Sequence, residues 1–187
     1  MALELKKRRF TLKEYYRMAE AGILGEDDRV ELIDGEIVEM TPIGARNAAC
    51  VDRLTDLFTE ALRGSALVRV QNPIRLSKKT EPQPDLALLR WKLDFYASGH
   101  PMPRDVFLLV EVCETSNEPD CRVKIPIYAR AGILEVWLMD LQQKTITTYQ
   151  DPTAASYRAV RVYWRGEQIA PSAFSDRSLA VSDVLLQ

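Results

Sequence analysis

The chain has 187 residues, of which 47% are hydrophobic and 28% are charged, and its formal net charge is −2. These values match a soluble globular protein, and no apolar stretch approaches the roughly 18 residues that a membrane span requires. The charge balance gives no global sign of a nucleic-acid-binding protein, so any such binding must depend on local groups.

Residues 1–10 are polar and basic, which argues against a secretory signal and makes the cytoplasm the expected location. They contain the basic run 6–9, and terminal charge runs are mostly solvated. We therefore expect residues 1–10 to form a flexible tail, with a functional contact as the alternative. Because the sequence has no internal repeat, low-complexity tract or linker, residues 1–187 are predicted to form a single domain.

The first part of the chain predicts a short helix, a hairpin and a long helix. A capping box of Thr11 and Glu14 opens the short helix. Asp34 and Gly35 suit a hairpin turn because both tolerate positive φ, and apolar residues at helical spacing follow. The expected ranges are 11–21 for the short helix, 29–33 and 36–40 for the hairpin strands, and 45–62 for the long helix.

The rest of the chain predicts several strands around one further helix. Gly132 separates that helix from its following strand and is a plausible C-cap. The tail is expected to add one or two edge strands and a short terminal segment. The expected strands are 66–76, 85–90, 106–113, 134–140 and 145–149, and the expected helix is 119–131.

The cysteines and the histidine exclude several kinds of site. Cys50, Cys113 and Cys121 have no CxxC spacing and are odd in number, so we expect reduced thiols. His100 is the only histidine, which excludes a multi-histidine zinc site built from this chain alone. A Ser-His-Asp hydrolase would depend on that residue, and no GxSxG turn is present.

Two acidic residues stand in apolar runs. Glu111 lies within 106–112, which otherwise reads as a buried strand, and Asp85 follows Pro84 at the head of a second apolar run. Burying an unpaired charge is costly, so a buried acid usually has a partner, a metal or a shifted pKa. The pattern therefore indicates one shared site. The alternatives are a turn role for Asp85 and a buried arginine partner for Glu111.

These residues resemble a nuclease motif. Pro84-Asp85 followed by Glu111 at the end of an apolar strand resembles the PD-(D/E)xK superfamily, with the usual lysine missing from the second motif. Residues 120–140, and the hairpin 31–36 with its following Pro-containing turn, are similar to the Uma family of putative restriction endonucleases. The resemblance implies an α/β, restriction-endonuclease-like fold: a mixed β-sheet flanked by α-helices, with an N-terminal helix and a β-hairpin.

The resemblance also implies a catalytic set of Glu31, Asp85, Glu111 and Lys124. Asp85 and Glu111, with the carbonyl of Val112 as a third oxygen, would bind magnesium or manganese. Hard cations prefer such oxygen ligands and activate water for hydrolysis. Lys124, displaced into the next helix, would orient or deprotonate the attacking water and stabilise the transition state.

Two further residues are possible accessories. Asn47 stands where members of the family commonly carry a histidine. An asparagine keeps a hydrogen bond there but does not titrate near neutral pH, so reduced activity is one expectation. Tyr128 lies four residues beyond Lys124 on the same helix face, and it either bonds into the site or simply packs.

The resemblance implies a metal-dependent endonuclease that hydrolyses phosphodiester bonds of nucleic acid, with DNA as the expected substrate. A homodimer is expected by analogy with the superfamily, and no membrane association is expected. One alternative is a catalytically weak or inactive nucleic-acid-binding or regulatory module on the same fold. Another is a hydrolase of small phosphoesters, which would agree with the lack of an obvious basic groove.

Overall fold

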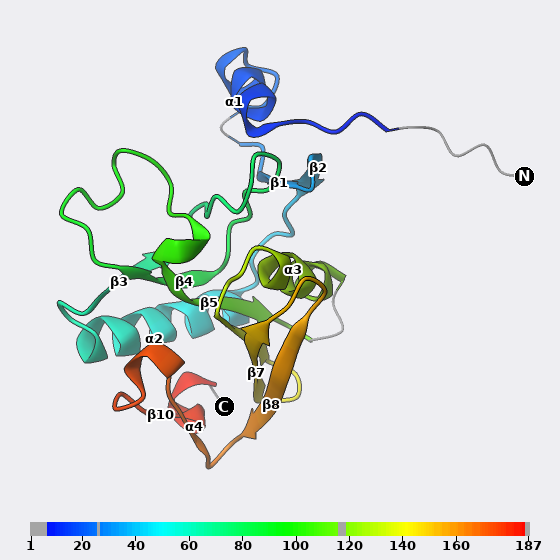
Figure 1. Ribbon diagram of the computed structural model, residues 1–187. Coiled ribbons are helices and arrows are strands. Elements are labelled where there is room, and N and C mark those ends of the chain that lie inside the picture. The colour runs from blue at the N-terminus through cyan, green and yellow to red at the C-terminus, as the bar shows by residue number, and fades with distance from the viewer. Residues whose placement is uncertain (1–6, 26, 116–118, 186–187) are drawn as a thin grey trace, which may run out of the picture.

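The computed structural model describes residues 7–25, 27–115 and 119–185. Its centre is a mixed six-stranded sheet with the strand order β3-β4-β5-β6-β7-β8 (Figure 1). Among these neighbours β5 and β6 run parallel, and the other pairs are antiparallel. The strands are β3 (Ala66–Val70), β4 (Leu86–Arg90), β5 (Val106–Cys113), β6 (Glu135–Asp140), β7 (Thr145–Pro152) and β8 (Tyr157–Trp164).

Helices pack on both faces of this sheet. On one face α2 (Ala45–Ala61) buries Leu54 and Phe58 against strands β4 to β6. On the other face α3 (Pro119–Arg130) buries Tyr128 in a second cluster. Because two parallel strands need a crossover connection, α3 is the link between β5 and β6 (Figure 1).

The position of β5 between these two layers explains its apolar sequence. Its side chains alternate between the faces, so Leu108 and Val110 point toward α2, whereas Leu109 points toward α3. A strand covered on both faces reads as a continuous apolar run. Glu111 shares the face of Leu109, and this alternation directs its carboxyl toward α3.

The N-terminal elements lie beside the sheet. The helix α1 (Leu12–Glu20) begins with the predicted capping box, and the hairpin consists of β1 (Val30–Ile33) and β2 (Glu36–Glu39). Gly35 in the hairpin turn has a φ of 80°, and an added Cβ would lie 2.9 Å from the backbone oxygen of Phe10. Glycine is therefore required by both the turn and the close approach.

The end of the predicted tail contacts this hairpin. The amide of Phe10 donates to the carbonyl of Gly35 at 2.8 Å, and Arg9 donates to the carbonyl of Asp34 at 2.8 Å. Lys7 forms an ion pair with Glu36 at 3.8 Å. Residues 1–6 of the predicted tail lie outside the described part of the chain.

The C-terminal part completes the α2 side of the core. The strands β9 (Gln168–Ile169) and β10 (Leu179–Ala180) pair with each other, and α4 (Val181–Val184) packs beside α2. Short 3₁₀ helices lie at Pro103–Asp105 and Ser172–Phe174. β8 is the expected edge strand, and β7 extends beyond its predicted end. The strand predicted for 66–76 ends at Val70 instead, because Gln71 has a φ of 48° and leaves the extended region.

The prediction of three reduced thiols is wrong for two of them. Cys113 and Cys121 form a disulfide with a Cα–Cα distance of 6.7 Å, whereas Cys50 is free and buried. Eight positions separate the paired residues, so the disulfide is not predicted by a CxxC spacing. The pairing joins the last residue of β5 to the first turn of α3, so it depends on how these two elements lie relative to each other.

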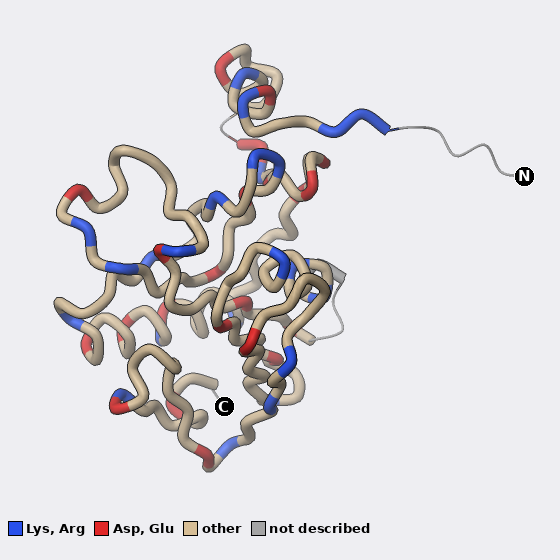
Figure 2. The backbone as a smooth tube through the Cα atoms, viewed as in Figure 1, with Lys and Arg blue, Asp and Glu red and all other residues tan. Residues whose placement is uncertain are grey.

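Charges are distributed without a single dominant sign. Figure 2 shows basic and acidic residues interspersed along the backbone, in agreement with the net charge of −2. Within the described ranges, no helix has the length and apolar character needed to span a membrane.

Candidate active site

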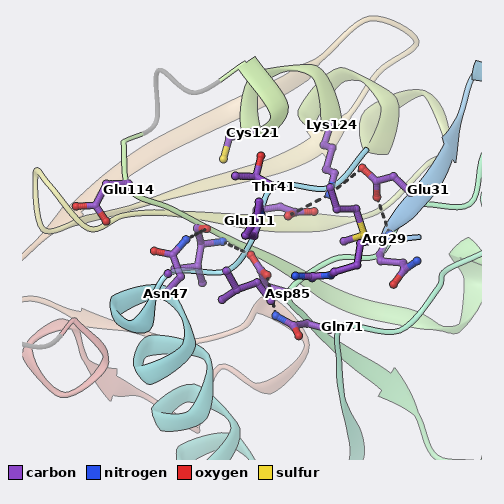
Figure 3. Close-up of a pocket in the computed structure, with 16 residues that line it drawn as sticks. Arg29, Glu31, Thr41, Asn47, Gln71, Asp85, Glu111, Glu114, Cys121 and Lys124 are labelled. Carbon is purple, nitrogen blue, oxygen red and sulfur yellow. Dashed lines mark hydrogen bonds and ion pairs between the residues drawn. The ribbon is translucent and has the colours of Figure 1, made fainter. Parts of the chain in front are cut away.

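A pocket of about 240 Å³ lies where β4 begins and β5 ends (Figure 3). The hairpin, the segment 40–44, the start of α2 and the start of α3 complete its walls. Except for Tyr128, all the residues predicted for the site line this pocket, namely Glu31, Asn47, Asp85, Glu111, Val112 and Lys124. Tyr128 lies behind Glu111 and reaches it by a hydrogen bond. Segments that are far apart in the sequence therefore meet at one place.

Asp85 is held at the head of β4 by two neighbours. Its Oδ2 accepts the backbone N–H of Val112 at 2.8 Å, and its Oδ1 accepts the side-chain amide of Gln71 at 3.5 Å. Burial raises the pKa of Asp85, and the N–H of Val112 and the charge of Lys124 oppose that rise. Asp85 is thus a half-buried acid with a defined orientation.

Glu111 is the most deeply placed acid of the pocket. Its side chain accepts a hydrogen bond from the hydroxyl of Tyr128, and its Oε2 lies 3.6 Å from the Nζ of Lys124. Burial raises the pKa of Glu111 to about 8; the charge of Lys124 opposes the rise and that of Asp85 adds to it. Burial therefore favours the protonated form of the Glu111 carboxyl in the absence of a metal, and the charge of Lys124 favours the ionised form.

Lys124 links the hairpin to the sheet. Its Nζ lies 3.3 Å from Oε1 of Glu31 and 3.6 Å from Oε2 of Glu111, and its side chain is only 11% exposed. Burial acts to lower the pKa of Lys124, but the charges of Glu111 and Glu31 outweigh it and raise the pKa. Lys124 therefore remains protonated. It is better suited to stabilising negative charge than to accepting a proton.

Glu31 is positioned by the hairpin and by the segment that precedes Asp85. Its Oε2 accepts the backbone N–H of Gln83 at 3.0 Å, while its Oε1 faces Lys124. A bridge between Leu32 and Glu81 fastens the hairpin to the same segment. The hairpin thus brings a second acid to Lys124 from a distant part of the sequence.

The peptide group of Val112 is fixed on both sides. Its N–H donates to Asp85, and its carbonyl accepts the side-chain amide of Asn47 at 3.1 Å. Asn47 lies in the first turn of α2. The carbonyl oxygen retains a second lone pair, so this hydrogen bond orients it without exhausting its capacity as an acceptor.

The comparisons with known proteins agree with this architecture. The model of the Uma2 family, described as "Putative restriction endonuclease", matches residues 12–182. The chain belongs to the Uma2 family. A crystal structure described as a putative nuclease belonging to DUF820 from Anabaena variabilis ATCC 29413 aligns with a TM-score of 0.74 over 94% of this chain and 97% of that chain, at 14% sequence identity. That likeness establishes the fold. No curated protein matches the chain.

The family and fold predictions are therefore confirmed. The mixed sheet flanked by helices, with an N-terminal helix and a hairpin, is the architecture that the motif residues implied. At the coarse level, membership in the Uma2 family places the chain among nuclease-type proteins with nucleic acid as the class of substrate. The predicted roles of the individual residues stay predictions.

The donor atoms of this Uma2 pocket fit a hard divalent cation. In the described ranges, no group of three or more His, Cys, Asp or Glu side chains is arranged as a metal site. The predicted ligands are two carboxylates and one carbonyl, an all-oxygen set of the kind that Mg²⁺ and Mn²⁺ accept while keeping several waters. The acids Glu31, Asp85 and Glu111 also outnumber the ammonium of Lys124, and a divalent cation would offset that excess.

Several pocket residues were not predicted. Gln71 and Gln83 donate to the acids Asp85 and Glu31, and Arg29 lines the open side of the pocket. Cys121 also lines it, through its bonded position at the start of α3. Polar residues of this kind occur throughout the sequence, and only the position of Arg29 at the start of the predicted hairpin strand 29–33 offered any signal.

Proposed function

We propose that this Uma2 protein is a metal-dependent endonuclease that hydrolyses phosphodiester bonds of nucleic acid, with DNA as the expected substrate. The observation that supports this proposal best is the convergence of Asp85, Glu111 and Lys124 in one pocket, where Lys124 lies 3.6 Å from Glu111 and Asp85 accepts the N–H of Val112. Phosphodiester hydrolysis requires acids that bind a divalent metal ion and a positive group that stabilises the negative charge developing on the phosphate. The two acids and the protonated Lys124 are groups of these kinds.

Each of these residues has a separate role in the proposal. Asp85, Glu111 and the Val112 carbonyl would hold Mg²⁺ or Mn²⁺. When bound, the cation would supply an activated water and a counter-charge for the phosphate. Lys124 orients the attacking water by hydrogen bonding and stabilises negative charge on the phosphate oxygens. Because the neighbouring acids raise the pKa of Lys124, we propose that another group accepts the proton of the attacking water.

The remaining predicted residues act on these groups. The carboxylate of Glu31 lies 3.3 Å from the ammonium of Lys124, and this ion pair holds the lysine side chain in the pocket wall. Asn47 orients the carbonyl of Val112, and Tyr128 orients the carboxyl of Glu111. We assign positioning roles to all of them, because their contacts run to other side chains or to the backbone of the pocket.

A second candidate is a weak or inactive nucleic-acid-binding module on the same fold. Asn47 favours it, because its amide is occupied by the carbonyl of Val112 and it does not titrate near neutral pH. A hydrolase of small phosphoesters is a third candidate, favoured by the limited pocket volume of about 240 Å³. Both candidates predict little or no cleavage of a long nucleic acid.

The deciding experiment measures cleavage of supercoiled plasmid and of a labelled single-stranded oligonucleotide with Mg²⁺ or Mn²⁺. Wild type is compared with Asp85→Asn and Lys124→Met, and Glu114→Gln serves as a control on the pocket wall outside the proposed set. We expect cleavage to fall roughly 100-fold or more in both site variants and to persist in the control. Circular dichroism and melting temperatures verify that each variant is folded.

The other outcomes separate the candidates. Cleavage that persists in both site variants would place the activity elsewhere. A folded wild-type protein that binds DNA without cutting it would favour the inactive module. Hydrolysis of a small phosphodiester without cleavage of DNA would favour the third candidate.

A further inference from the structure

We propose that Arg29 binds a backbone phosphate adjacent to the scissile one and thereby selects a polynucleotide strand as the substrate. This inference rests on the proposed nuclease function and deepens it, since it specifies how the pocket recognises a strand with several phosphates. Arg29 is not part of the set that the sequence motifs indicated.

The position of Arg29 places its charge at the mouth of the site. The residue directly precedes β1, its side chain is exposed, and it lines the same pocket as Asp85 and Glu111. In Figure 3 this side chain extends toward Asp85, and its guanidinium is close enough to act electrostatically on that carboxylate. A strand lying over the predicted metal ligands would therefore pass within reach of Arg29.

The other cations around the pocket are already paired. Lys124 faces both Glu31 and Glu111, and Arg46 forms an ion pair with Glu114. The guanidinium of Arg29, by contrast, forms no hydrogen bond or ion pair with another residue in the described part of the chain. Its positive charge is available to a ligand.

The backbone that carries Arg29 is held firmly. The carbonyl of Arg29 accepts the amide of Met40 at 2.8 Å. The next carbonyl, that of Val30, accepts the hydroxyl of Tyr15 at 3.0 Å and the side-chain amide of Gln83 at 3.3 Å. Only the side chain is therefore free to adjust, and a fixed stem reduces the entropy lost when a ligand is bound.

The chemistry of the guanidinium identifies the ligand. Its planar set of N–H donors carries a positive charge and matches two oxygens of one phosphate. The acids of the pocket repel an anion unless a cation is bound, so a contact between Arg29 and a phosphate would offset part of that repulsion. A backbone phosphate next to the scissile phosphate is a ligand of this kind.

The test measures binding of labelled single-stranded and duplex oligonucleotides by fluorescence anisotropy over a series of salt concentrations. Arg29→Ala and Arg29→Lys are compared with the parent protein in a Lys124→Met background with Mg²⁺, and a gel verifies that the oligonucleotide stays intact. Arg63→Ala is the matched control, because Arg63 is exposed just beyond the other end of α2 and forms no ion pair in the described ranges. The Arg63→Ala substitution removes one positive charge, as Arg29→Ala does, but at a position far from the pocket.

We expect Arg29→Ala to weaken binding roughly 10-fold or more, and to reduce the slope of log affinity against log salt by about 0.7 for single strands or 0.9 for duplex. Arg29→Lys should keep the slope and lose part of the affinity, since a point charge replaces a bidentate donor. Arg63→Ala should match the parent protein.

A second arm examines the nucleic acid. Oligonucleotides with a single uncharged methylphosphonate linkage, moved one position at a time, should bind the parent protein more weakly at one flanking position. Arg29→Ala should lose sensitivity at that position alone. Such a pattern would assign the phosphate to Arg29.

The failures are distinguishable. If Arg29→Ala has the same affinity and slope as Arg63→Ala while wild type cuts DNA, the inference about Arg29 is wrong and the proposed function stands. If wild type neither binds nor cuts any oligonucleotide, both proposals are wrong.

Discussion

At the scale of single residues, the carboxyl of Glu111 couples metal binding to pH. Burial raises its pKa to about 8, so a cation that binds this carboxylate must displace a proton at lower pH. We expect the affinity for Mn²⁺ to increase with pH up to about 8 and then to level off. Calorimetry in buffers of different ionisation enthalpy should detect proton release at about pH 6 and little at about pH 9. Affinity that is independent of pH would contradict this prediction.

The same shift predicts the sign of the pH dependence of stability in the metal-free protein. The pKa of Glu111 is higher in the folded state than its ordinary value of 4.5, so the folded state binds the additional proton. The contribution of Glu111 to the free energy of unfolding is therefore full below that ordinary pKa and is lost as the pH rises through about 8. Melting temperatures in EDTA should decrease over this range in wild type and decrease less in Glu111→Gln, the matched variant.

At the scale of elements, the disulfide joins the two that carry Glu111 and Lys124. Cys113 ends β5 two residues after Glu111, and Cys121 lies in α3 three residues before Lys124. Closing a loop of this size restricts the unfolded chain and stabilises the fold by about 2–3 kcal/mol. Urea unfolding with and without reductant should show that loss in wild type, whereas Cys121→Ser should not respond to reductant. Three free thiols in unfolded, non-reduced wild type would contradict the bond.

The elements themselves were predictable where the signal is local. The capping box of α1 and the Asp34–Gly35 turn are confirmed, because both depend on residues within one turn of chain. The strand predicted to reach residue 76 is shorter, because Gln71 has a positive φ that its residue type does not signal; its amide donates to the carbonyl of Asp85.

At the scale of the whole molecule, the number of strands cut depends on the number of sites. Each chain carries one pocket with Asp85 and Glu111, and one site cuts one strand at a time. We expect a homodimer that converts supercoiled plasmid to the linear form, since two-fold symmetry places two sites on two strands. Sedimentation at the assay concentration measures the mass. A monomer that produces nicked circles alone would contradict the prediction.

The sequence by itself determined the alternating patterns, caps and turns of this protein, because these arise from the period and the preferences of neighbouring residues. Through its motif residues it also indicated the family, the fold and the acids Asp85 and Glu111. The tertiary structure alone decided that Lys124 meets Glu31 across 93 positions of sequence, that Cys113 bonds to Cys121, and that Arg29 stands free at the pocket. The physical reason is that such contacts depend on how the layers pack, and residues distant in sequence carry no local trace of that packing.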